Sequence, residues 1–493
     1  MKYILLIITL SILSIGGFLA ESEAVSFENE VQADKLQYRA IAEELSLPAM
    51  HGLPPANYFS FSYLKASQPK QRPVTFAFNG GPGSASHWLH LGGVGPKRIP
   101  VSLKGQQPFS VITNKENILE STDLVFIDPI GTGFSRASNP VGSEGNVPTG
   151  ASQEFWGVVE DAKSITAFIK AWLQKHRRAN SPIYILGESY GSLRATLVAD
   201  ELERKHSISV DGLILLSAVQ NYRNIRTPDG SIMGYVSLLP SYAATAWFHK
   251  KAGQDHPSLE AFLAKAREFA GGSYAHGLIS GNRLSESKRK DIAESISSYT
   301  GLDASYILDN NLHVGTLDFL RNLQHAPLQK LSRLDSRHSG SYEGEKSNGY
   351  GLDPYASIVR EPFIRATQSY LTNDLKVPTS KGAYIASARN QPYWRWNWNV
   401  WGDNNIPSGA RFINVMPNLE RTLKTNTKMK VMVVAGYFDF ATPFYSIENA
   451  FSELTSGQKR VSFHHYKAGH IIYLDDAARR QLSNDIRAFI EDK

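Results

Sequence analysis

Short runs of four to six residues that are mostly or wholly apolar recur along the first half of the chain, and several end at residues that interrupt regular structure. Such runs are typical of strands buried on both faces of a parallel sheet. Between several of them lie longer stretches with an apolar side chain at every third or fourth position, which is typical of amphipathic helices. The predicted strands are 58–63, 74–78, 124–127, 183–186 and 213–216, and the predicted helices are 154–176 and 192–205.

The order of these segments predicts the fold class. Strands and helices alternate from Phe76 to Ala218, which favours a mostly parallel sheet covered by helices on both faces. The alternation stops near Asn221, where helical stretches, turns rich in Gly and Ser, and an aromatic cluster begin. The strand pattern resumes late in the chain, with predicted strands at 431–435 and 461–466 and a predicted helix over 475–491. The simplest interpretation is one sheet domain, formed by 25–221 and 426–493, that is interrupted by an inserted cap over 222–425.

The first residues form a separate apolar segment. Lys2 precedes a nearly uninterrupted apolar run over 3–19, and the small residues Ala20 and Ala24 follow it. This order is typical of a Sec-type signal peptide over residues 1–24 that is cleaved near 20–24. The alternative is an uncleaved anchor, because about 17 apolar residues approach the length of a membrane span. The short apolar region favours cleavage, so we expect a secreted or periplasmic protein that is free of the membrane afterwards.

Composition and charge exclude several classes of protein. The chain has 493 residues, of which 42% are hydrophobic, so its core can be large. It contains no cysteine, which excludes disulfides and thiolate chemistry. The formal net charge is +6, but 52 Lys and Arg are scattered among 46 acids, so we expect no nucleic-acid partner. Neither composition nor charge indicates an oligomeric state.

The strongest chemical signal lies where a buried strand meets the following helix. There, Gly187-Glu188-Ser189-Tyr190-Gly191 has the Gly-x-Ser-x-Gly pattern of a nucleophile elbow. The glycines let strand and helix approach closely, and the helix N-terminus favours negative charge developing on a substrate. The pattern by itself occurs by chance in many proteins, but in this setting it predicts a nucleophilic serine.

A nucleophilic serine needs a base, and the base needs an acid that orients it. In the α/β-hydrolase fold both partners follow late strands, with the acid before the histidine. Asp439 and His470 each come just after one of the two late strands, whereas His464 and His465 lie within a strand. We therefore predict an α/β-hydrolase fold with an inserted cap and a triad of Ser189, Asp439 and His470.

A glycine-rich loop at 79–83, Asn-Gly-Gly-Pro-Gly, ends an early strand at the edge of the sheet where Ser189 is expected. Its backbone N–H groups, together with that of Tyr190, can face an oxyanion. A tight turn is the more usual meaning of paired glycines. A phosphate loop is excluded, because the pattern G-x-x-x-x-G-K-[ST] is absent.

Taken together, five blocks resemble successive motifs of the serine carboxypeptidase family, in family order and with similar spacing. They are 79–84 (NGGPGS), 128–135 (DPIGTGFS), 187–191 (GESYG), 436–440 (GYFDF) and 469–470 (GH). The resemblance implies a serine peptidase that removes residues from the free C-terminus of a peptide, often at acidic pH. We expect it to need neither metal nor cofactor.

The resemblance also implies a role for each matching residue. The triad is Ser189, Asp439 and His470, the oxyanion donors are Gly81 and Tyr190, and the terminal carboxylate of the substrate is held by Asn79 and Glu188. A protonated Glu188 can donate a hydrogen bond to a carboxylate that an ionised glutamate would repel. An acid preference would follow from that requirement.

Two positions depart from the family pattern. A second carboxylate-binding acid normally stands in a Glu-x-Gly-Pro stretch, and here Gly93 takes its place. A tryptophan usually found two residues before the Asn is replaced by Ala77. Glu188 therefore works alone or with another partner.

Other functions and roles remain open at this stage. An esterase or acyltransferase would use the same fold and triad. A catalytically inactive binding protein is disfavoured, because every catalytic position is filled. The cluster of Trp394, Trp396, Trp398 and Trp401 either lines a substrate cleft or packs in the core.

Overall fold

The computed structural model describes residues 26–33, 36–50, 52–66, 71–101, 110–138, 150–227, 231–324, 326, 328–341, 353–390, 394–399 and 413–492. The predicted signal peptide and Trp401 lie outside these residues. Within the described ranges, no helix combines the length and the apolar character that crossing a bilayer requires.

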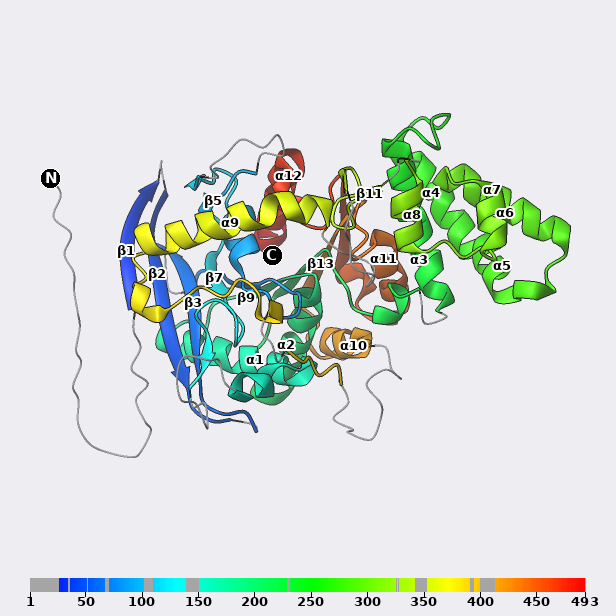
Figure 1. The fold of residues 1–493 in the computed structure, drawn as a ribbon. Helices are drawn as coiled ribbons and strands as arrows, with labels where there is room; N and C mark the ends of the chain where they lie inside the picture. Colours follow the sequence, from blue (N-terminus) through cyan, green and yellow to red (C-terminus); the bar gives the residue numbers. More distant parts are fainter. Residues whose placement is uncertain are drawn as a thin grey trace, which may run out of the picture.

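A ten-stranded sheet runs through the molecule (Figure 1). Its order in space is β1-β2-β3-β7-β4-β9-β10-β13-β14, and β8 also pairs with β3. Neighbours from β1 to β7 pair antiparallel, and neighbours from β7 to β14 pair parallel, so the sheet is mixed but mostly parallel. The strands of this sheet are β1 (Ser26–Ala33), β2 (Leu36–Leu47), β3 (Ala56–Lys65), β4 (Val74–Phe78), β7 (Asp123–Ile127), β8 (Arg136–Ala137), β9 (Ile183–Glu188), β10 (Gly212–Leu216), β13 (Lys430–Gly436) and β14 (Val461–Tyr466). Two small pairs are formed by β5 (Lys97–Arg98) with β6 (Ile112–Thr113), and by β11 (Gln329–Leu331) with β12 (Ser339–Ser341).

Helices cover both faces of the sheet. Figure 1 shows α1, α2 and α10 below it and α9 and α12 above it. The helices are α1 (Val158–Lys175), α2 (Tyr190–His206), α3 (Ile232–Phe248), α4 (Leu259–Phe269), α5 (Ala275–Ser280), α6 (Glu286–Thr300), α7 (Ala304–Asp309), α8 (Thr316–Asn322), α9 (Pro354–Asn373), α10 (Met416–Thr425), α11 (Phe444–Ser452) and α12 (Asp476–Glu491).

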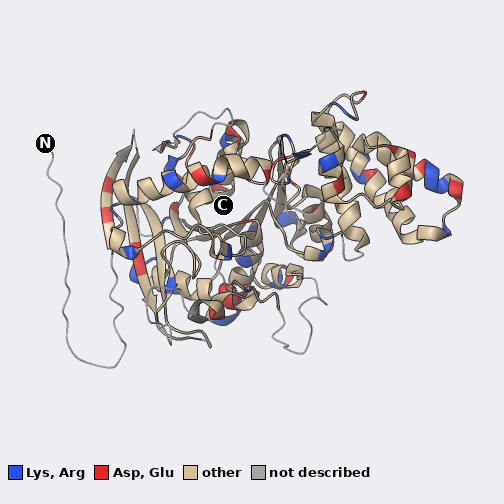
Figure 2. Ribbon diagram, in the orientation of Figure 1, with Lys and Arg blue, Asp and Glu red and all other residues tan. Residues whose placement is uncertain are grey.

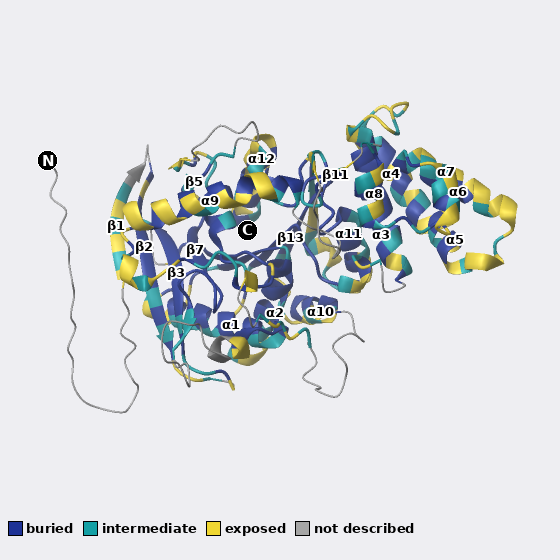
Figure 3. Ribbon diagram, in the orientation of Figure 1, coloured by how far each residue is buried: buried dark blue, intermediate teal, exposed yellow. Residues whose placement is uncertain are grey.

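The apolar runs predicted as buried strands face a hydrophobic core on each side. In β10, Leu213 and Leu215 belong to the core between the sheet and helices α1 and α2. Ile214 and Leu216 belong to the core between the sheet and helices α9 and α12. Successive side chains of a strand point to opposite faces, so a strand between two cores must be apolar at every position. Figure 3 shows the central strands buried and exposed residues gathered on the outer helices and on β1.

The chain between β10 and β13 contributes to two regions. Helices α3 to α8 extend to one side of the sheet, at the right of Figure 1, and share a third hydrophobic core. Helices α9 and α10 instead pack against opposite faces of the sheet. Residues of both charges alternate along α6 and α9, whereas α3 contains no charged residue (Figure 2).

The structure confirms the predicted fold class, because this mixed, mostly parallel sheet between two helical layers is an α/β-hydrolase fold. The helix predicted over 154–176 begins only at Val158. Gly157 before it has extended backbone angles of φ −153° and ψ 158°, and residues 150–155 form a 3₁₀ turn. Strands β1 and β2 and helix α9 were not predicted from the apolar pattern.

Candidate active site

Ser189 occupies a strained turn between β9 and α2. Its backbone angles are φ 57° and ψ −126°, a region that non-glycine residues rarely adopt. The turn is held from both sides, since Ser189 N–H donates to the carbonyl of Leu216 at 2.9 Å and its own carbonyl accepts from Ser192 N–H at 2.9 Å. Strain that is retained in this way is typical of functional sites.

Glycines let three segments meet at this turn. A Cβ on Gly187 would lie 2.0 Å from the carbonyl oxygen of Gly191, so strand and helix could not approach as they do. A Cβ on Gly80 would lie 2.5 Å from the carbonyl oxygen of Glu188 and 2.6 Å from the nitrogen of Tyr190. The glycine-rich loop and the predicted nucleophile are therefore in direct backbone contact.

That contact brings the two predicted oxyanion donors together. Tyr190 is the first residue of α2, so the helix contains no carbonyl that its N–H could reach. Gly81 follows Gly80 with φ 109°, which only glycine adopts readily. Arg194, a buried residue of α2, donates to the carbonyl of Asn79 at 2.7 Å and to Asp161 of α1 at 2.6 Å, which ties the loop to the two helices.

Asp439 and His470 form a buried pair. The distance from His470 Nδ1 to Asp439 Oδ2 is 2.7 Å, and Asp439 is completely buried. The other carboxylate oxygen of Asp439 accepts from the N–H groups of Ala441 at 2.7 Å and Thr442 at 3.0 Å. Burial lowers the pKa of His470, but the contact with Asp439 outweighs burial and leaves that pKa above its usual value.

The end of β10 joins this pair to the nucleophile turn. Leu216 accepts the N–H of Ser189, and the hydroxyl of the next residue, Ser217, donates to the carbonyl of His470 at 2.5 Å. No hydrogen bond within the described residues joins Ser189 Oγ to His470. Such bonds are often long in enzymes without a substrate and shorten when it binds.

Glu188 lies buried beside Ser189, with 4% of its surface exposed. Asn79 Nδ2 donates to its Oε2 at 2.7 Å, and the hydroxyl of Tyr473 donates to the same oxygen at 2.5 Å. Burial raises the pKa of Glu188 to about 7, against the opposing effects of His470, Tyr473 and Asn79. This carboxyl group therefore holds its proton far more readily than an exposed glutamate.

The sequence missed two polar partners in the site. The hydroxyl of Thr442 donates to Asp439 Oδ2 at 2.7 Å, and an Asp-x-x-Thr spacing is a recognisable signal for such a local bond. Tyr473 had no comparable signal, because its contact with Glu188 joins residues that are 285 positions apart.

The tryptophan cluster borders the same loop and turn. Trp394 packs against Gly83, where a Cβ would lie 2.5 Å from the indole, and it stacks on Trp396 with 5.5 Å between ring centroids. Trp396 and Trp398 pack edge-on against Tyr190, at 5.3 and 6.1 Å.

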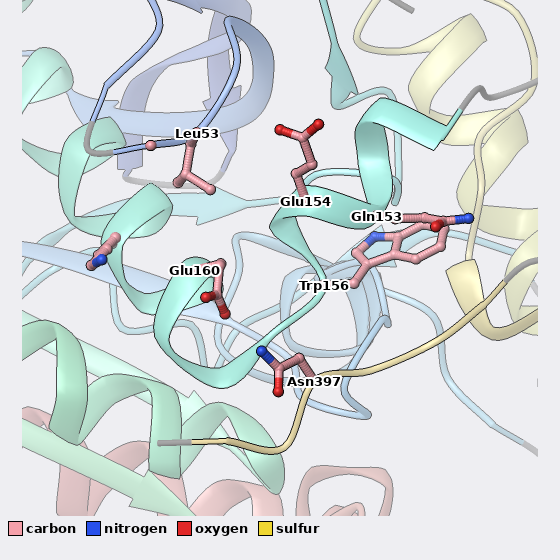
Figure 4. A pocket seen from close by; sticks show the side chains of 8 residues that line it. Leu53, Gln153, Glu154, Trp156, Glu160 and Asn397 are labelled. Carbon is pink, nitrogen blue, oxygen red and sulfur yellow. The ribbon is translucent and has the colours of Figure 1, made fainter. Parts of the chain in front are cut away.

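On its other side, Trp394 contacts Trp156, with 4.7 Å between ring centroids. Trp156 lines a pocket of 430 Å³. Figure 4 shows Glu154, Glu160 and Asn397 around this pocket, and none of the predicted site residues lines it. The tryptophans therefore lie between the loop at 79–83 and a separate, mostly polar pocket.

A family model described as serine carboxypeptidase matches residues 54–226. This stretch contains the loop at 79–83 and Ser189, but neither Asp439 nor His470. Serine carboxypeptidase-like 8 of Arabidopsis thaliana is 26% identical over 196 residues, which are 36% of this chain and 41% of that protein. The pheromone-processing carboxypeptidase of Yarrowia lipolytica is 29% identical over 159 residues, or 31% of this chain and 23% of that protein. The matches thus span less than half the length of these relatives.

One solved structure resembles the fold over nearly the whole chain. It is a prohormone-processing carboxypeptidase from Saccharomyces cerevisiae, with a TM-score of 0.53 and 16% sequence identity. The similarity covers 95% of this chain and 91% of that chain. The similarity in fold thus extends well beyond residues 54–226, to which the family-model match is confined.

Proposed function

We propose that this chain, which belongs to the serine carboxypeptidase family, hydrolyses C-terminal residues of peptides through an acyl-enzyme on Ser189. The observation that carries the proposal is the buried Glu188, held by Asn79 directly beside Ser189. A hydrolase of esters alone has no use for a carboxyl group that keeps its proton at this place.

In the proposed reaction, Ser189 Oγ attacks the scissile carbonyl while His470 Nε2 takes the hydroxyl proton. Asp439, bonded to Nδ1, holds the imidazole in the required tautomer and stabilises its charged form. The N–H groups of Gly81 and Tyr190 bind the oxyanion. His470 then returns the proton to the leaving amine, and water hydrolyses the acyl-enzyme by the same route.

The position of the scissile bond follows from where the substrate ends. Neutral Glu188 donates its proton in a hydrogen bond to the terminal carboxylate, and Asn79 lies beside it. Only the last peptide bond then reaches Ser189, so residues are released one at a time. An ionised Glu188 would repel the same carboxylate.

Two further proposals concern the rest of the chain. We propose that residues 222–425 act as a cap, in which α3 to α8 form a unit with its own core beside the site. We also propose export to the periplasm or the medium, on the basis of the apolar segment before residue 25.

The first experiment tests the nucleophile. Ser189→Ala is expected to abolish both peptide hydrolysis and covalent labelling by a fluorophosphonate, because no other group can form the acyl-enzyme. Labelling is measured by intact mass on folded protein. Full activity in this variant would exclude Ser189 as the nucleophile, and failure of the folded wild-type protein to label would instead favour an inactive binding protein.

The second experiment tests the substrate class. A peptide with a free C-terminus is expected to lose single residues, as followed by mass spectrometry, and the same peptide with an amidated C-terminus is expected to resist. Equal cleavage of both would contradict a carboxypeptidase. Cleavage of neither peptide, together with hydrolysis or transfer of small esters, would favour the esterase or acyltransferase.

A further inference from the structure

Tyr473 contacts both Glu188, to which its hydroxyl donates, and Gly93, which stands where the family pattern has an acid. It lies three residues after His470, in the turn that leads to α12, and 2% of its surface is exposed. Its ring packs over two successive glycines. A Cβ on Gly92 would lie 2.8 Å from the ring, and one on Gly93 would lie 3.1 Å from it. The absence of a side chain at residue 93 therefore makes room for the ring.

The hydroxyl of Tyr473 and the amide of Asn79 both donate to one oxygen of Glu188, Oε2. An oxygen that accepts two hydrogen bonds is a poor place for a proton, so a neutral Glu188 carries its proton on Oε1. Within the described part of the chain, Oε1 has no hydrogen-bond partner. The proton is thus on the oxygen that is free to donate to a ligand.

We propose that Tyr473 is a positioning residue for recognition of the substrate's terminal carboxylate: by occupying Oε2 of Glu188 together with Asn79, it directs the acid proton of Glu188 to Oε1, where it meets that carboxylate. The inference rests on the proposed carboxypeptidase function and names the device that replaces a second acid. Tyr473 touches no reacting atom, so it acts on substrate binding rather than on the chemical step.

The other explanation of Tyr473 is packing, because a buried aromatic ring stabilises a core whatever its hydroxyl does. Tyr473→Phe separates the two roles, since it keeps the ring on Gly92 and Gly93 and removes only the hydroxyl. The matched control is Tyr466→Phe. Tyr466 is also 2% exposed and also donates to a carboxylate, Asp485 Oδ2 at 2.6 Å, but on β14 and away from Glu188.

The assay compares two substrates in the full-length protein. For a peptide with a free C-terminus, Tyr473→Phe is expected to raise KM on the order of tenfold with kcat nearly unchanged, which is the effect of losing one hydrogen bond to an ionisable group. For a small activated ester without a carboxylate, KM and kcat are expected to stay at the wild-type values. In Tyr466→Phe, KM and kcat are expected to stay at the wild-type values for both substrates.

The pH profile supplies a second measurement that packing does not affect. The Tyr473 hydroxyl is one of the contacts that lower the pKa of Glu188, so removing it raises that pKa further. The pH at which activity on free-acid peptides is lost is therefore expected to move upward in Tyr473→Phe. Gly93→Ala leaves the Tyr473 hydroxyl intact but pushes the ring away from Glu188. It is expected to raise KM for the peptide in the same way.

Unchanged KM and an unchanged pH profile in Tyr473→Phe would overturn the inference, and so would an equal loss on peptide and ester, which would indicate general damage to the site. If Tyr473→Phe fails to fold, the KM of Gly93→Ala decides the question. Failure of the proposed carboxypeptidase function would give a different result, because the wild-type protein itself would then cleave free-acid and amidated peptides equally.

Discussion

Glu188 and Ser189 are neighbours in the chain, but their surroundings are opposite. Ser189 is partly exposed at the strained turn, whereas Glu188, the last residue of β9, is buried against Asn79 and Tyr473. A reactive hydroxyl and a carboxyl group of raised pKa are thus placed side by side by one turn of the backbone. In the proposed function, the ionisation of Glu188 sets the pH range in which Ser189 acts on a peptide.

The pH dependence of peptide cleavage tests this pairing. Activity is expected to fall at low pH as His470 gains the proton that prevents it from acting as a base. It is expected to fall again as Glu188 ionises around its pKa of about 7 and begins to repel the substrate's carboxylate. These two losses of activity, the low-pH limb and the high-pH limb of the profile, belong to His470 and Glu188 as a coupled pair, since each group shifts the pKa of the other.

Glu188→Gln removes one of these limbs. An amide stays neutral at every pH and can still donate a hydrogen bond. The variant is therefore expected to keep its kcat/KM on free-acid peptides at pH values where the wild-type enzyme has lost it. The loss at low pH remains but moves to lower pH, because the charge of Glu188 no longer raises the pKa of His470. A high-pH loss of activity that persists in Glu188→Gln would show that another group causes it.

At the scale of elements, the site depends on two backbone segments that approach more closely than they could if a side chain stood between them. The loop after β4 and the turn after β9 touch at Gly80, because these strands are parallel neighbours whose carboxyl ends meet at one edge of the sheet. The proposed oxyanion donors, Gly81 and Tyr190, come from one segment each. Their spacing is therefore a property of how two elements pack and not of either element alone.

Gly80→Ala tests that packing. The added Cβ would lie 2.5 Å from the backbone of Glu188, so the loop must move away from the turn. We expect kcat to fall on the order of 100-fold, as when an oxyanion donor is lost, and stability to fall by about 1–3 kcal/mol. Gly271→Ala is the control, because its backbone is helical and, in the described part of the chain, the only atom outside its own helix within 4 Å of the added Cβ is the hydroxyl oxygen of Tyr445, at 3.2 Å. Wild-type kcat in Gly80→Ala would contradict this account.

At the scale of the whole molecule, the described residues form three large hydrophobic cores and a smaller one that contains Tyr190. Two lie on the faces of the sheet, and the third lies inside α3 to α8. Phe440, the residue after Asp439, belongs to the third core and stacks on Tyr242 at 5.5 Å and packs on Phe319 at 5.6 Å. The helical unit thus packs against the loop that carries Asp439, the proposed orienting acid.

Phe440→Ala should therefore affect stability and activity together. Truncating a buried phenylalanine costs about 3–5 kcal/mol, and kcat is expected to fall because the Asp439 loop loses its anchor. Ile279→Ala, on the same helical unit but with a residue that is 59% exposed, is expected to change stability by no more than about 0.5 kcal/mol. Denaturant unfolding and kcat measure the two effects. A destabilised Phe440→Ala with wild-type kcat would show that the cap does not support the site.

The sequence predicted those elements whose burial determines their composition. Strands such as β9 and β10 lie between two cores, so every position is apolar and the pattern is readable without a structure. The glycines around Ser189 were readable for a similar reason, because close contact within five residues leaves a local signature. α9 escaped prediction although its buried side chains recur every three or four residues, because Pro362 lies inside the helix and argues against one. β2 escaped because the charged Glu43 is among its buried positions.

The sequence alone therefore determined the fold class and the candidate nucleophile, base and acid, since each depends on order along the chain and on local packing. Only the tertiary structure decided what Glu188 touches. Its contact with Tyr473 joins two segments through the third dimension, and it exists because Gly93 leaves space for a ring from the far end of the chain. Sequence spacing carries no record of such a contact, and only the folded chain brings these residues together.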